Sequence, residues 1–403
     1  MNELIVFLLA GGKGERLYPL TKNRAKPAVP FGGNYRIVDF PLSNCINSNL
    51  RKIFVLTQYK TISLDRHIRM GWSILSPELG EHVTIIPAQQ RISEDWYRGT
   101  ADAVFQNIYT LDRERSRLVL ILAGDHIYKM DYRPMIEFHN QSGAEITVGV
   151  MDIPIRQASR FGVLEINGDD RIVAFKEKPA DPQPIPGFPD RALISMGIYL
   201  FKTESLVREV IRDAKVEEST HDFGRDILPR VIQEKKSVFA YPFQDWRKNE
   251  KRYWRDVGTI QAYYEASMDL VSVSPELDLY DPTWPIRSYL PPLPPAKTVF
   301  QENGRTGQIL DSLICNGSIV SGSTVIHSIV APRVFLHSYS RIEDSVILEG
   351  VEIGRHVRIR RAIIDKFVRV PDGVEIGYNL EADRHRFTVN DEGIVVIPER
   401  ASI

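Results

Sequence analysis

The chain has 403 residues, of which 43% are hydrophobic and 26% are charged, the composition of a globular protein with room for two domains. Its formal net charge of −1 argues against a general binder of nucleic acid or of membrane surfaces, because such proteins usually carry a large basic excess. The two cysteines, Cys45 and Cys315, lie far apart, so we expect reduced thiols and no disulfide framework. Met1 leads almost directly into an apolar run, which predicts a cytoplasmic protein without a targeting segment.

The first predicted element is a strand at residues 5–10, where the apolar run IVFLLA has the length of a buried parallel strand. A glycine turn follows, and Gly11, Gly12 and Gly14 let the backbone adopt positive φ and approach a ligand closely. A dinucleotide fingerprint would need glycine where Leu17 stands, and a Walker A loop would need serine or threonine where Gly14 stands. Neither motif is present, and from the glycines alone an ordinary strand-to-helix turn remains the alternative.

Several cations follow the glycines, among them Arg16, Arg24 and Lys26. They lie on a loop that is positioned by a buried strand, and they suit the oxygens of a triphosphate, which they would hold by charge-assisted hydrogen bonds. We therefore predict that residues 11–26 bind a nucleotide.

Apolar or β-branched runs alternate with helix-like and loop segments through the first two-thirds of the chain, which is the pattern of an open α/β sheet. Such sheets bind ligands at the carboxyl ends of their strands, so the residues that follow each run are candidates for a site. The predicted strands are residues 5–10, 53–57, 83–87, 118–122, 146–150 and 198–201.

The loop after the strand at 83–87 carries the string WYRGTADA at residues 96–103. It combines a flat aromatic ring (Tyr97), a cation (Arg98) and a glycine that permits close approach (Gly99), so a purine ring could stack or hydrogen-bond there. The alternative is a surface aromatic cluster ahead of a helix that begins near Thr100.

Asp125 comes just after the strand at 118–122, where a hard divalent cation can be held. Mg²⁺ is usually bound by one or two carboxylates together with substrate phosphates. A lone aspartate at a strand end is more often a helix N-cap, so a second carboxylate is needed, and Asp256 in the string WRDVG at 254–258 supplies one. We expect His126 to pack nearby rather than to bind Mg²⁺, which prefers oxygen.

Three further strings offer groups for a sugar phosphate. FKEKP at 175–179 places the carboxylate of Glu177, suited to sugar hydroxyls, beside Lys178, suited to a phosphate. SMGIY at 195–199 and HDFG at 221–224 add hydroxyl, aromatic and acidic groups. Each string is weak alone, because lysine-rich edges of strands are normally solvated.

The α/β pattern stops at a proline-rich segment, residues 275–295, which cannot form a continuous helix. It also contains leucine, tyrosine and tryptophan, so we predict an ordered connector and place the domain boundary here.

Beyond the connector, aliphatic residues recur every six positions, as at Ile314, Val320 and Ile326. A second series of the same kind runs from Val330 to Leu348. Such hexapeptide repeats are typical of a β-helix whose coils stack an aliphatic core and whose end needs capping or docking. A few short antiparallel strands, the alternative, would show a period of two and clear hairpin turns.

The glycine loop GGxGxRL followed by RAKP resembles the signature of the sugar-nucleotide pyrophosphorylases, and WYRGTADA is similar to the string in the ADP-glucose pyrophosphorylase branch of that family. The resemblance covers essentially the whole chain. It implies a nucleotidyltransferase domain with an open, mostly parallel sheet at 1–274, the connector at 275–298, and a left-handed parallel β-helix at 299–403. The implied reaction is ATP plus glucose 1-phosphate giving ADP-glucose and pyrophosphate, with Mg²⁺, for glycogen or starch synthesis.

The resemblance also implies roles for individual residues. Arg16, Lys26 and Asp125 would be catalytic, and Lys178 would orient the attacking phosphate. The pair Asp125 and Asp256 would bind the metal. The nucleotide contacts would be Gly11, Gly12, Gly14, Arg24, Tyr97 and Gly99, and the glucose 1-phosphate contacts would be Gly162, Glu177, Lys178, Ser195, Tyr199, Asp222, Phe223 and Trp254.

Regulation and assembly are less well defined by these patterns. The resemblance implies a homotetramer, but Asn23 stands where some relatives carry a lysine that binds an allosteric activator. The arginines at 360, 361, 384 and 386 would suit a small anionic effector, or simply form a solvated basic face. Two rival functions stay open, a related pyrophosphorylase for another nucleotide or sugar, and a non-catalytic regulatory subunit of the same fold.

Overall fold

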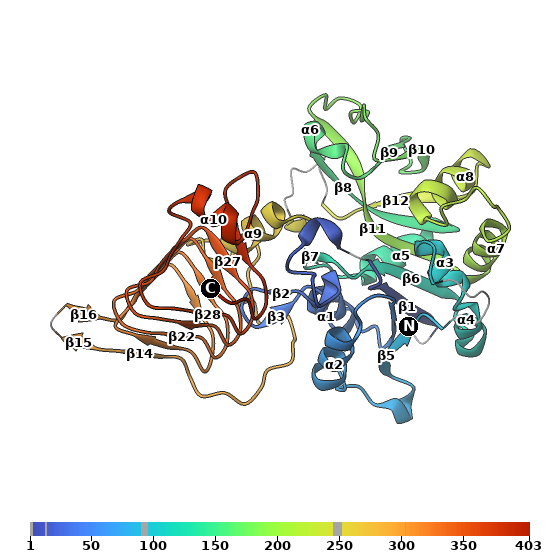
Figure 1. The fold of residues 1–403 in the computed structure, drawn as a ribbon. Coiled ribbons are helices and arrows are strands. Elements are labelled where there is room, and N and C mark those ends of the chain that lie inside the picture. The colour runs from blue at the N-terminus through green and yellow to red at the C-terminus, as the bar shows by residue number, and fades with distance from the viewer. Residues whose placement is uncertain (1–2, 13, 90–95, 245–251, 303) are drawn as a thin grey trace.

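The computed structural model describes residues 3–12, 14–89, 96–244, 252–302 and 304–403. The larger part of the molecule is an α/β domain and the smaller part is a β-helix that lies beside it (Figure 1). Within the described residues, no helix is long and apolar enough to cross a membrane.

A group of four parallel strands forms the core of the large sheet, in the order β5, β4, β1, β6. Each coincides with a strand that the apolar runs predict. Next to β6 lies β11, which is antiparallel and leads to an extension of four more strands. Their bounds are β1 Leu4–Leu9, β4 Lys52–Thr57, β5 His82–Pro87, β6 Leu118–Ala123, β8 Ile146–Pro154, β9 Gly162–Ile166, β10 Ile172–Glu177, β11 Arg191–Lys202 and β12 Val238–Pro242.

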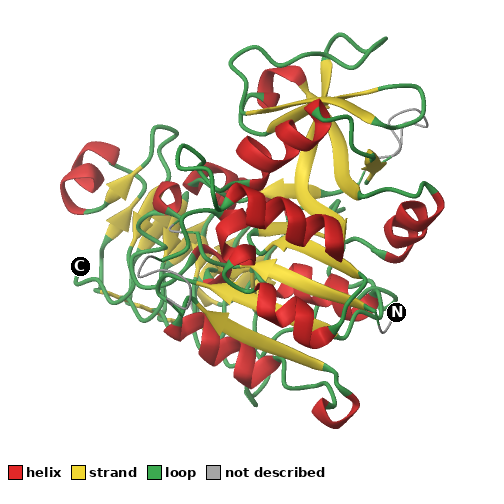
Figure 2. Cartoon of the chain, turned by 90° about the vertical axis from the view of Figure 1, so that its right-hand side faces the viewer, coloured by secondary structure: helices red, strands yellow, loops and turns green. Residues whose placement is uncertain are grey.

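Helices cover the sheet (Figure 2), so its central strands are buried on both sides. Along β1, Val6 and Leu8 pack into one hydrophobic cluster and Ile5 and Phe7 into another, because successive side chains of a strand point to opposite faces. This two-sided burial explains the unbroken apolar run. The helices are α1 Asp39–Asn47, α2 Ile62–Gly71, α3 Thr100–Phe105, α4 Ile108–Glu114, α5 Arg133–Gln141, α6 Ile155–Ala158, α7 Thr203–Asp213, α8 Leu228–Gln233, α9 Ile260–Asp269 and α10 Leu380–Arg386.

Short elements follow the carboxyl ends of the strands and shape the site. Two small antiparallel pairs are β2 with β3 and β7 with β13. Their bounds, with those of the short helical turns, are η1 Glu15–Leu17, η2 Lys26–Ala28, β2 Pro30–Phe31, β3 Tyr35–Arg36, η3 Pro77–Leu79, β7 His126–Tyr128, η4 Phe223–Ile227 and β13 Trp254–Asp256.

The second domain is a β-helix built from three parallel ladders of short strands, which confirms the fold that the repeats predict. Each ladder continues from coil to coil. The first contains β14 Lys297–Val299, β19 Ile319–Ser321, β22 Phe335–Leu336, β25 Glu352–Ile353 and β28 Arg369–Val370. The second contains β17 Gln308–Leu310, β20 Thr324–Ile326, β23 Arg341–Glu343, β26 Arg358–Arg360 and β29 Glu375–Ile376. The third contains β18 Leu313–Ile314, β21 Ile329–Val330, β24 Val346–Ile347, β27 Ala362–Ile364 and β31 Val395–Ile397, with β30 Thr388–Val389 at its edge, while β15 Gln301–Glu302 and β16 Arg305–Thr306 form a separate pair.

The register of the repeat differs from a strict period of six. Val325 fills the core below Ile342, whereas the predicted core residue Ile326 is only half-buried. The reason lies in the coil length: buried Ser345 repeats Ser328 after 17 residues, one fewer than three full hexapeptides. The coil before it is shorter still, since Ile319 pairs with Phe335 after 16 residues and the buried Val320 is followed in the core by Val325 after only five.

The connector and the β-helix both dock on the α/β domain. Trp284 in the connector donates a hydrogen bond of 2.9 Å to the side-chain oxygen of Asn44 in α1. One hydrophobic cluster includes Phe31 and Tyr263 from the first domain and Ile363 from the β-helix. Gly33 lies so close to Cys315 that a Cβ there would collide with the thiol sulfur. The β-helix is therefore packed against the loop that follows the glycine turn.

Candidate active site

The α/β domain contains a cavity of about 860 Å³ at the carboxyl edge of its parallel strands. The loops after β1, β4 and β6 form one wall, and segments around residues 97–100, 197–199 and 222–224 form the other. Many of the expected site residues line it: Gly11, Gly12, Gly14, Arg16, Lys26, Tyr97, Gly99, Asp125, Glu177, Tyr199, Asp222 and Phe223. The edge of the sheet thus gathers groups from distant parts of the sequence, as expected for an open α/β sheet.

The glycine loop is held in a turned conformation. Gly14 has a φ of +66°, and a Cβ there would lie 3.0 Å from Thr21 and 3.1 Å from the Cβ of Lys26, so only glycine fits without displacing a neighbour. Thr21 Oγ1 donates a 2.9 Å hydrogen bond to the carbonyl of Gly14, and Lys60 donates a 2.7 Å hydrogen bond to the carbonyl of Thr21. These contacts keep the backbone of the loop turned along the cavity wall.

Lys26 lies at the centre of the charged groups in the cavity. Its Nζ atom donates hydrogen bonds to Asp125 over 2.9 Å and to Asp256 over 2.7 Å. Asp125 follows β6, and Asp256 ends β13, whose pairing with β7 sets Asp256 opposite His126. The side chain of Lys26 is buried, whereas both carboxylates are partly exposed, and Asp125 lines the cavity.

The electrostatics of this site favour the charged forms of Lys26 and Asp125. Burial by itself would lower the pKa of Lys26, but the carboxylates of Asp125 and Asp256 outweigh it and raise that pKa. Burial would likewise raise the pKa of Asp125, but the Lys26 ammonium, helped by His126, holds it below its usual value. At neutral pH Lys26 is therefore an ammonium and Asp125 a carboxylate.

Asp125, His126 and Asp256 form a group that could hold a metal ion, with one potential ligand atom of each within 4.8 Å of the others. The donor set fits a divalent cation, because the two carboxylates already attract a positive charge to this point. The imidazole is less suited to the role: Nε2 lies 3.6 Å from Asp125, and Nδ1 is buried with no hydrogen-bond partner in the described part of the chain. A ligating histidine normally has an acceptor on its second nitrogen.

Glu177 projects toward the other wall of the cavity between two glycines. A Cβ on either Gly162 or Gly224 would lie 2.8 Å from its Oε2 atom, so both positions must lack a side chain for this carboxylate to keep its place. Lys178 lies 3.1 Å from the other carboxylate oxygen, and its side chain is half exposed. Gly162 and Lys178 support Glu177 without lining the cavity themselves.

Ser195 and Tyr199 lie on either side of an irregularity in β11. The hydroxyl of Ser195 donates to the hydroxyl of Tyr199 over 3.3 Å and accepts from the backbone N–H of Gly197 over 3.2 Å. Tyr199 also packs on Phe223, with ring centroids 5.8 Å apart. Of these residues, Tyr199, Gly197 and Phe223 line the cavity, and Ser195 supports them from behind.

Asp222 has a structural task as well as a place in the cavity wall. It caps the helical turn η4, because its Oδ1 accepts hydrogen bonds from the backbone N–H groups of Gly224 and Arg225. Its Oδ2 accepts a hydrogen bond of 3.0 Å from Thr100, which joins η4 to the start of α3. Without any ligand, the carboxylate of Asp222 therefore already accepts hydrogen bonds from both η4 and the start of α3.

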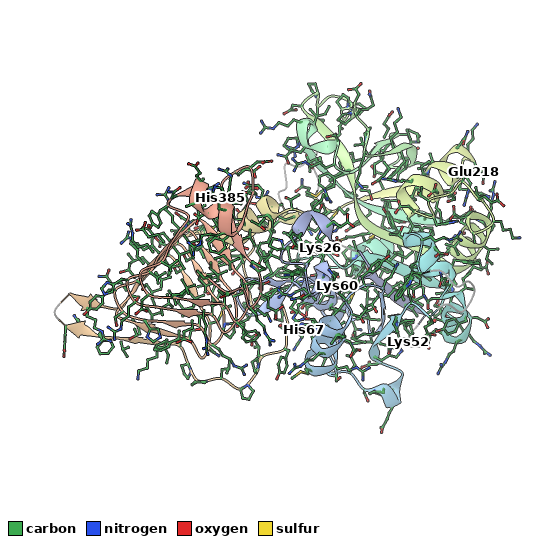
Figure 3. The ribbon with its side chains drawn as sticks, in the orientation of Figure 1. Lys26, Lys52, Lys60, His67, Glu218 and His385 are labelled. Carbon is green, nitrogen blue, oxygen red and sulfur yellow. The ribbon has the colours of Figure 1, made fainter. Side chains whose placement is uncertain are left out.

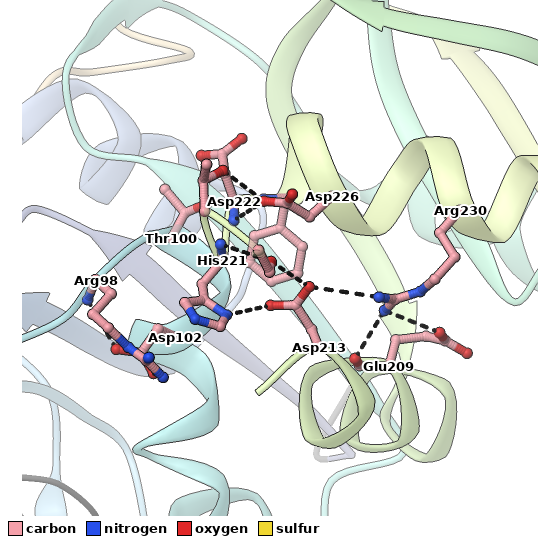
Figure 4. Close-up of polar contacts among 12 residues, drawn as sticks. Arg98, Thr100, Asp102, Glu209, Asp213, His221, Asp222, Asp226 and Arg230 are labelled. Carbon is pink, nitrogen blue, oxygen red and sulfur yellow. Dashed lines mark hydrogen bonds and ion pairs between the residues drawn. The ribbon is translucent and has the colours of Figure 1, made fainter. Parts of the chain in front are cut away.

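A buried polar network stands behind this wall (Figure 4). His221 Nδ1 lies 2.8 Å from Asp213, which in turn lies 3.5 Å from Arg230. The backbone of His221 packs on Gly99, where any Cβ would collide with its carbonyl. The requirement for glycine at 99 is therefore set by this close packing of backbones, in addition to its position in the cavity.

Tyr97 is held from two sides. Its hydroxyl accepts a 2.9 Å hydrogen bond from Asn107, and its carbonyl accepts one of 3.1 Å from Gln58. Next to it, Trp96 stacks on Tyr59 with centroids 6.0 Å apart. Gln58 and Tyr59 line the cavity but were not among the predicted site residues, although they directly follow the predicted strand at 53–57 and the rule of carboxyl ends could have found them.

Trp254 lies beside the charged centre and outside the cavity wall. Its ring packs on His126 and on Phe161, with centroids 4.9 and 5.5 Å away. Its Nε1 donor is buried and has no partner within the described ranges. In this state Trp254 positions β13 and the neighbouring Asp256.

Arg24 does not line the cavity, which corrects the expectation from its place in the RAKP string. Its guanidinium is buried and donates hydrogen bonds to Asp365 over 2.9 Å and to Glu399 over 3.0 Å, both in the second domain. The physical reason is that Arg24 and Lys26 point to different sides of the turn before η2. Neighbouring Asn23 also reaches Glu399, over 3.3 Å.

Comparison with known proteins shows similarity through both domains. A family model described as nucleotidyl transferase matches residues 5–273, and one described as GlmU-like, C-terminal hexapeptide matches residues 294–397. A Rhodopirellula baltica protein named glucose-1-phosphate adenylyltransferase is 52% identical over 402 residues, which are 98% of this chain and 90% of that protein. One of the same name from Methylococcus capsulatus is 52% identical over 396 residues (98% and 93%). Glucose-1-phosphate adenylyltransferase 2 of Vibrio cholerae is 48% identical over 401 residues (99% and 98%).

Proposed function

Because this chain belongs to the nucleotidyl transferase family, and its relatives named glucose-1-phosphate adenylyltransferase match nearly its whole length, we propose that it makes ADP-glucose and pyrophosphate from ATP and glucose 1-phosphate. It is a nucleotidyltransferase that serves glycogen or starch synthesis. The observation that carries the assignment is the cavity in which a glycine loop, a buried lysine and two carboxylates meet opposite Glu177.

The chemistry needs positioning more than proton transfer. A phosphate oxygen of glucose 1-phosphate attacks the α-phosphorus of ATP in line, the new P–O bond forms, and the bond to the pyrophosphate oxygen breaks. The attacking phosphate is already an anion, so no general base or covalent intermediate is required. What the protein must supply is alignment and neutralisation of the charge on the phosphates.

Each side of the cavity has a part in that task. Lys26 and Arg16 would hold the triphosphate beside the glycine loop, and Tyr97 and Gly99 would border the base. Glu177 would accept hydrogen bonds from sugar hydroxyls while Lys178 guides the attacking phosphate. The remaining proposed sugar-phosphate contacts, Ser195, Tyr199, Asp222, Phe223, Gly162 and Trp254, form or support the same wall.

We assign Asp125 and Asp256 to Mg²⁺, because both are oxygen donors that converge on one positive charge. When bound there, the ion would neutralise charge on the phosphates and polarise the α-phosphorus.

The proposal extends to the domain organisation, the oligomeric state and the cellular location of the protein. The proposed units are the catalytic domain at 1–274, the connector at 275–298 and the β-helix at 299–403. We further propose a cytoplasmic homotetramer that binds no nucleic acid, with the β-helix arginines open to a small anionic effector.

A pyrophosphate-release assay on the purified chain tests the function. Glucose 1-phosphate should give release with ATP well above that with UTP, dTTP or GTP. A preference for another nucleotide would indicate a related pyrophosphorylase, and no release with any nucleotide would indicate a non-catalytic subunit.

A further inference from the structure

The ammonium of Lys26 occupies the point where a divalent cation would be bound. It lies 2.9 Å from Asp125 Oδ2 and 2.7 Å from Asp256 Oδ1, so both of the carboxylates assigned to the metal are engaged by one buried cation. The side chain of Lys26 is only 7% exposed, and among the described residues no other cationic side chain forms an ion pair with these two oxygens.

We propose that the ammonium of Lys26 takes the place of the metal ion in the substrate-free protein. It prevents a divalent cation from binding there without nucleotide, and it moves away only when nucleotide phosphates bind. The first half concerns the free protein alone. The second half rests on the proposed function, since it needs a ligand that carries phosphates into the cavity.

Geometry makes the two cations exclude one another. Mg²⁺ binds carboxylate oxygens at about 2.0–2.1 Å in near-octahedral order, and the Lys26 nitrogen already fills the space between the same oxygens. Like charges at such short range repel strongly in a partly buried site. A metal can enter between Asp125 and Asp256 only if the ammonium moves away.

The surroundings of Lys26 give it somewhere to move. Its Cβ packs on the glycine loop, where a Cβ on Gly14 would lie only 3.1 Å away, so the base of the side chain is fixed next to the phosphate-binding wall. The rest of the side chain lines the cavity together with Arg16 and Gly12. A rotation of the flexible chain beyond Cβ would carry the ammonium from the carboxylates to a triphosphate on that loop.

The exchange would couple metal and nucleotide. Without phosphates, leaving the carboxylates would cost Lys26 both of its partners in a buried position. With phosphates present, new anionic acceptors replace them, and the freed carboxylates attract the metal. Binding of the two ligands is therefore cooperative even though each occupies its own place in the cavity.

Mn²⁺ binding to the full chain, followed by electron paramagnetic resonance without nucleotide, tests the first half. Lys26→Met and Lys26→Gln should each bind one Mn²⁺ at least about tenfold more tightly than the wild type, because the competing charge is gone. Gln keeps hydrogen bonding to the carboxylates, so it provides the test if Met prevents folding. Adding Asp125→Asn to either variant should abolish the gain.

Lys52→Met is the matched control. It also removes a lysine from a carboxylate, Glu114 at 3.0 Å, but Lys52 lies apart from Lys26 (Figure 3) and does not line the cavity, so the variant should bind Mn²⁺ as the wild type does. Equal Mn²⁺ affinity in the wild type and both Lys26 variants would overturn the proposal. That outcome is distinct from a failure of the proposed function, which would appear as absent pyrophosphate release in the wild type.

A non-hydrolysable ATP analogue tests the coupling. It should tighten Mn²⁺ binding in the wild type by a larger factor than in Lys26→Met, after correction for Mn²⁺ bound by the free analogue. An equal factor in both proteins would contradict the exchange.

Discussion

Arg24 donates a hydrogen bond of 2.9 Å to Asp365, a residue 341 positions further along the chain, and both side chains are almost completely buried. The pair joins the segment after the glycine loop to the β-helix. Lys26, whose ammonium bonds to Asp125 and Asp256, is only two residues from Arg24, so the interface between the domains and the charged centre share one short segment.

The first prediction concerns this pair. Arg24→Met should lower the thermal denaturation temperature by about 5–10 °C, because it leaves the buried carboxylate of Asp365 without its charged partner. The double variant Arg24→Met/Asp365→Asn should recover part of the loss, since no unpaired charge remains at 365. Arg358→Ala breaks an exposed pair with Glu375 in the same domain and should change the temperature by no more than about 2 °C.

The second prediction concerns Asp125. Asp125→Asn should lower the rate of pyrophosphate release by at least about 100-fold, because it removes a charge that binds both Lys26 and the proposed metal. Its circular dichroism spectrum should match that of the wild type. Asp169→Asn, in the exposed turn between β9 and β10, is the control and should keep full activity. Near-normal turnover of Asp125→Asn would refute the assignment.

The third prediction concerns Gly224. A Cβ at this position would lie 2.8 Å from Glu177 and 3.3 Å from Asp222, so Gly224→Ala should displace Glu177 from its place in the cavity wall. We expect the KM for glucose 1-phosphate to rise about fivefold or more, the effect of losing a hydrogen bond to a charged group, with the KM for ATP unchanged. Gly168→Ala, where a Cβ meets nothing within 4 Å, should alter neither constant.

The fourth prediction concerns the buried His139, which lies 2.8 Å from Thr147. Burial, helped by Lys202, lowers its pKa from 6.5 to about 4. Between pH 6.5 and 4, His139 is therefore protonated in the unfolded chain but stays neutral in the folded chain. Its contribution to stability is complete above pH 6.5 and is lost as the pH falls through this range.

Thermal denaturation of His139→Asn across that range checks the fourth prediction. The variant should be less stable than the wild type at pH 7, yet lose less stability between pH 6.5 and 4.5. Parallel curves for the two proteins would show that His139 does not contribute to acid sensitivity.

Several parts of the molecule could be predicted from the sequence. The central strands are buried on both faces, so runs such as residues 5–10 and 118–122 are apolar throughout and easily recognised. The rule that sites lie at carboxyl ends then brings Asp125 and the glycine loop to one edge. The antiparallel β9 and β10 were not predicted, because they are half exposed and lack a continuous apolar run.

Contacts between residues that are far apart in the sequence could not be predicted. Nothing in the RAKP string indicates that Arg24 turns to Asp365 while Lys26 turns to Asp125, because these choices depend on how the two domains pack. The repeat in the β-helix shows a similar limit. Its aliphatic spacing predicts the coil, but the shortened step from Val320, which places Val325 rather than Ile326 in the core, is visible only once the coils are stacked.

Cys315 provides a built-in reporter of contact between the domains. Gly33 covers its sulfur, and burial raises its pKa to about 12, so a thiol reagent meets neither an accessible nor an ionised group while the domains are docked. Its labelling rate would then measure how often the interface opens, with Cys45, buried inside the first domain, as the internal reference for unfolding of that domain. The dissociation of the two halves can thus be followed in the natural sequence, without an attached dye or a substitution.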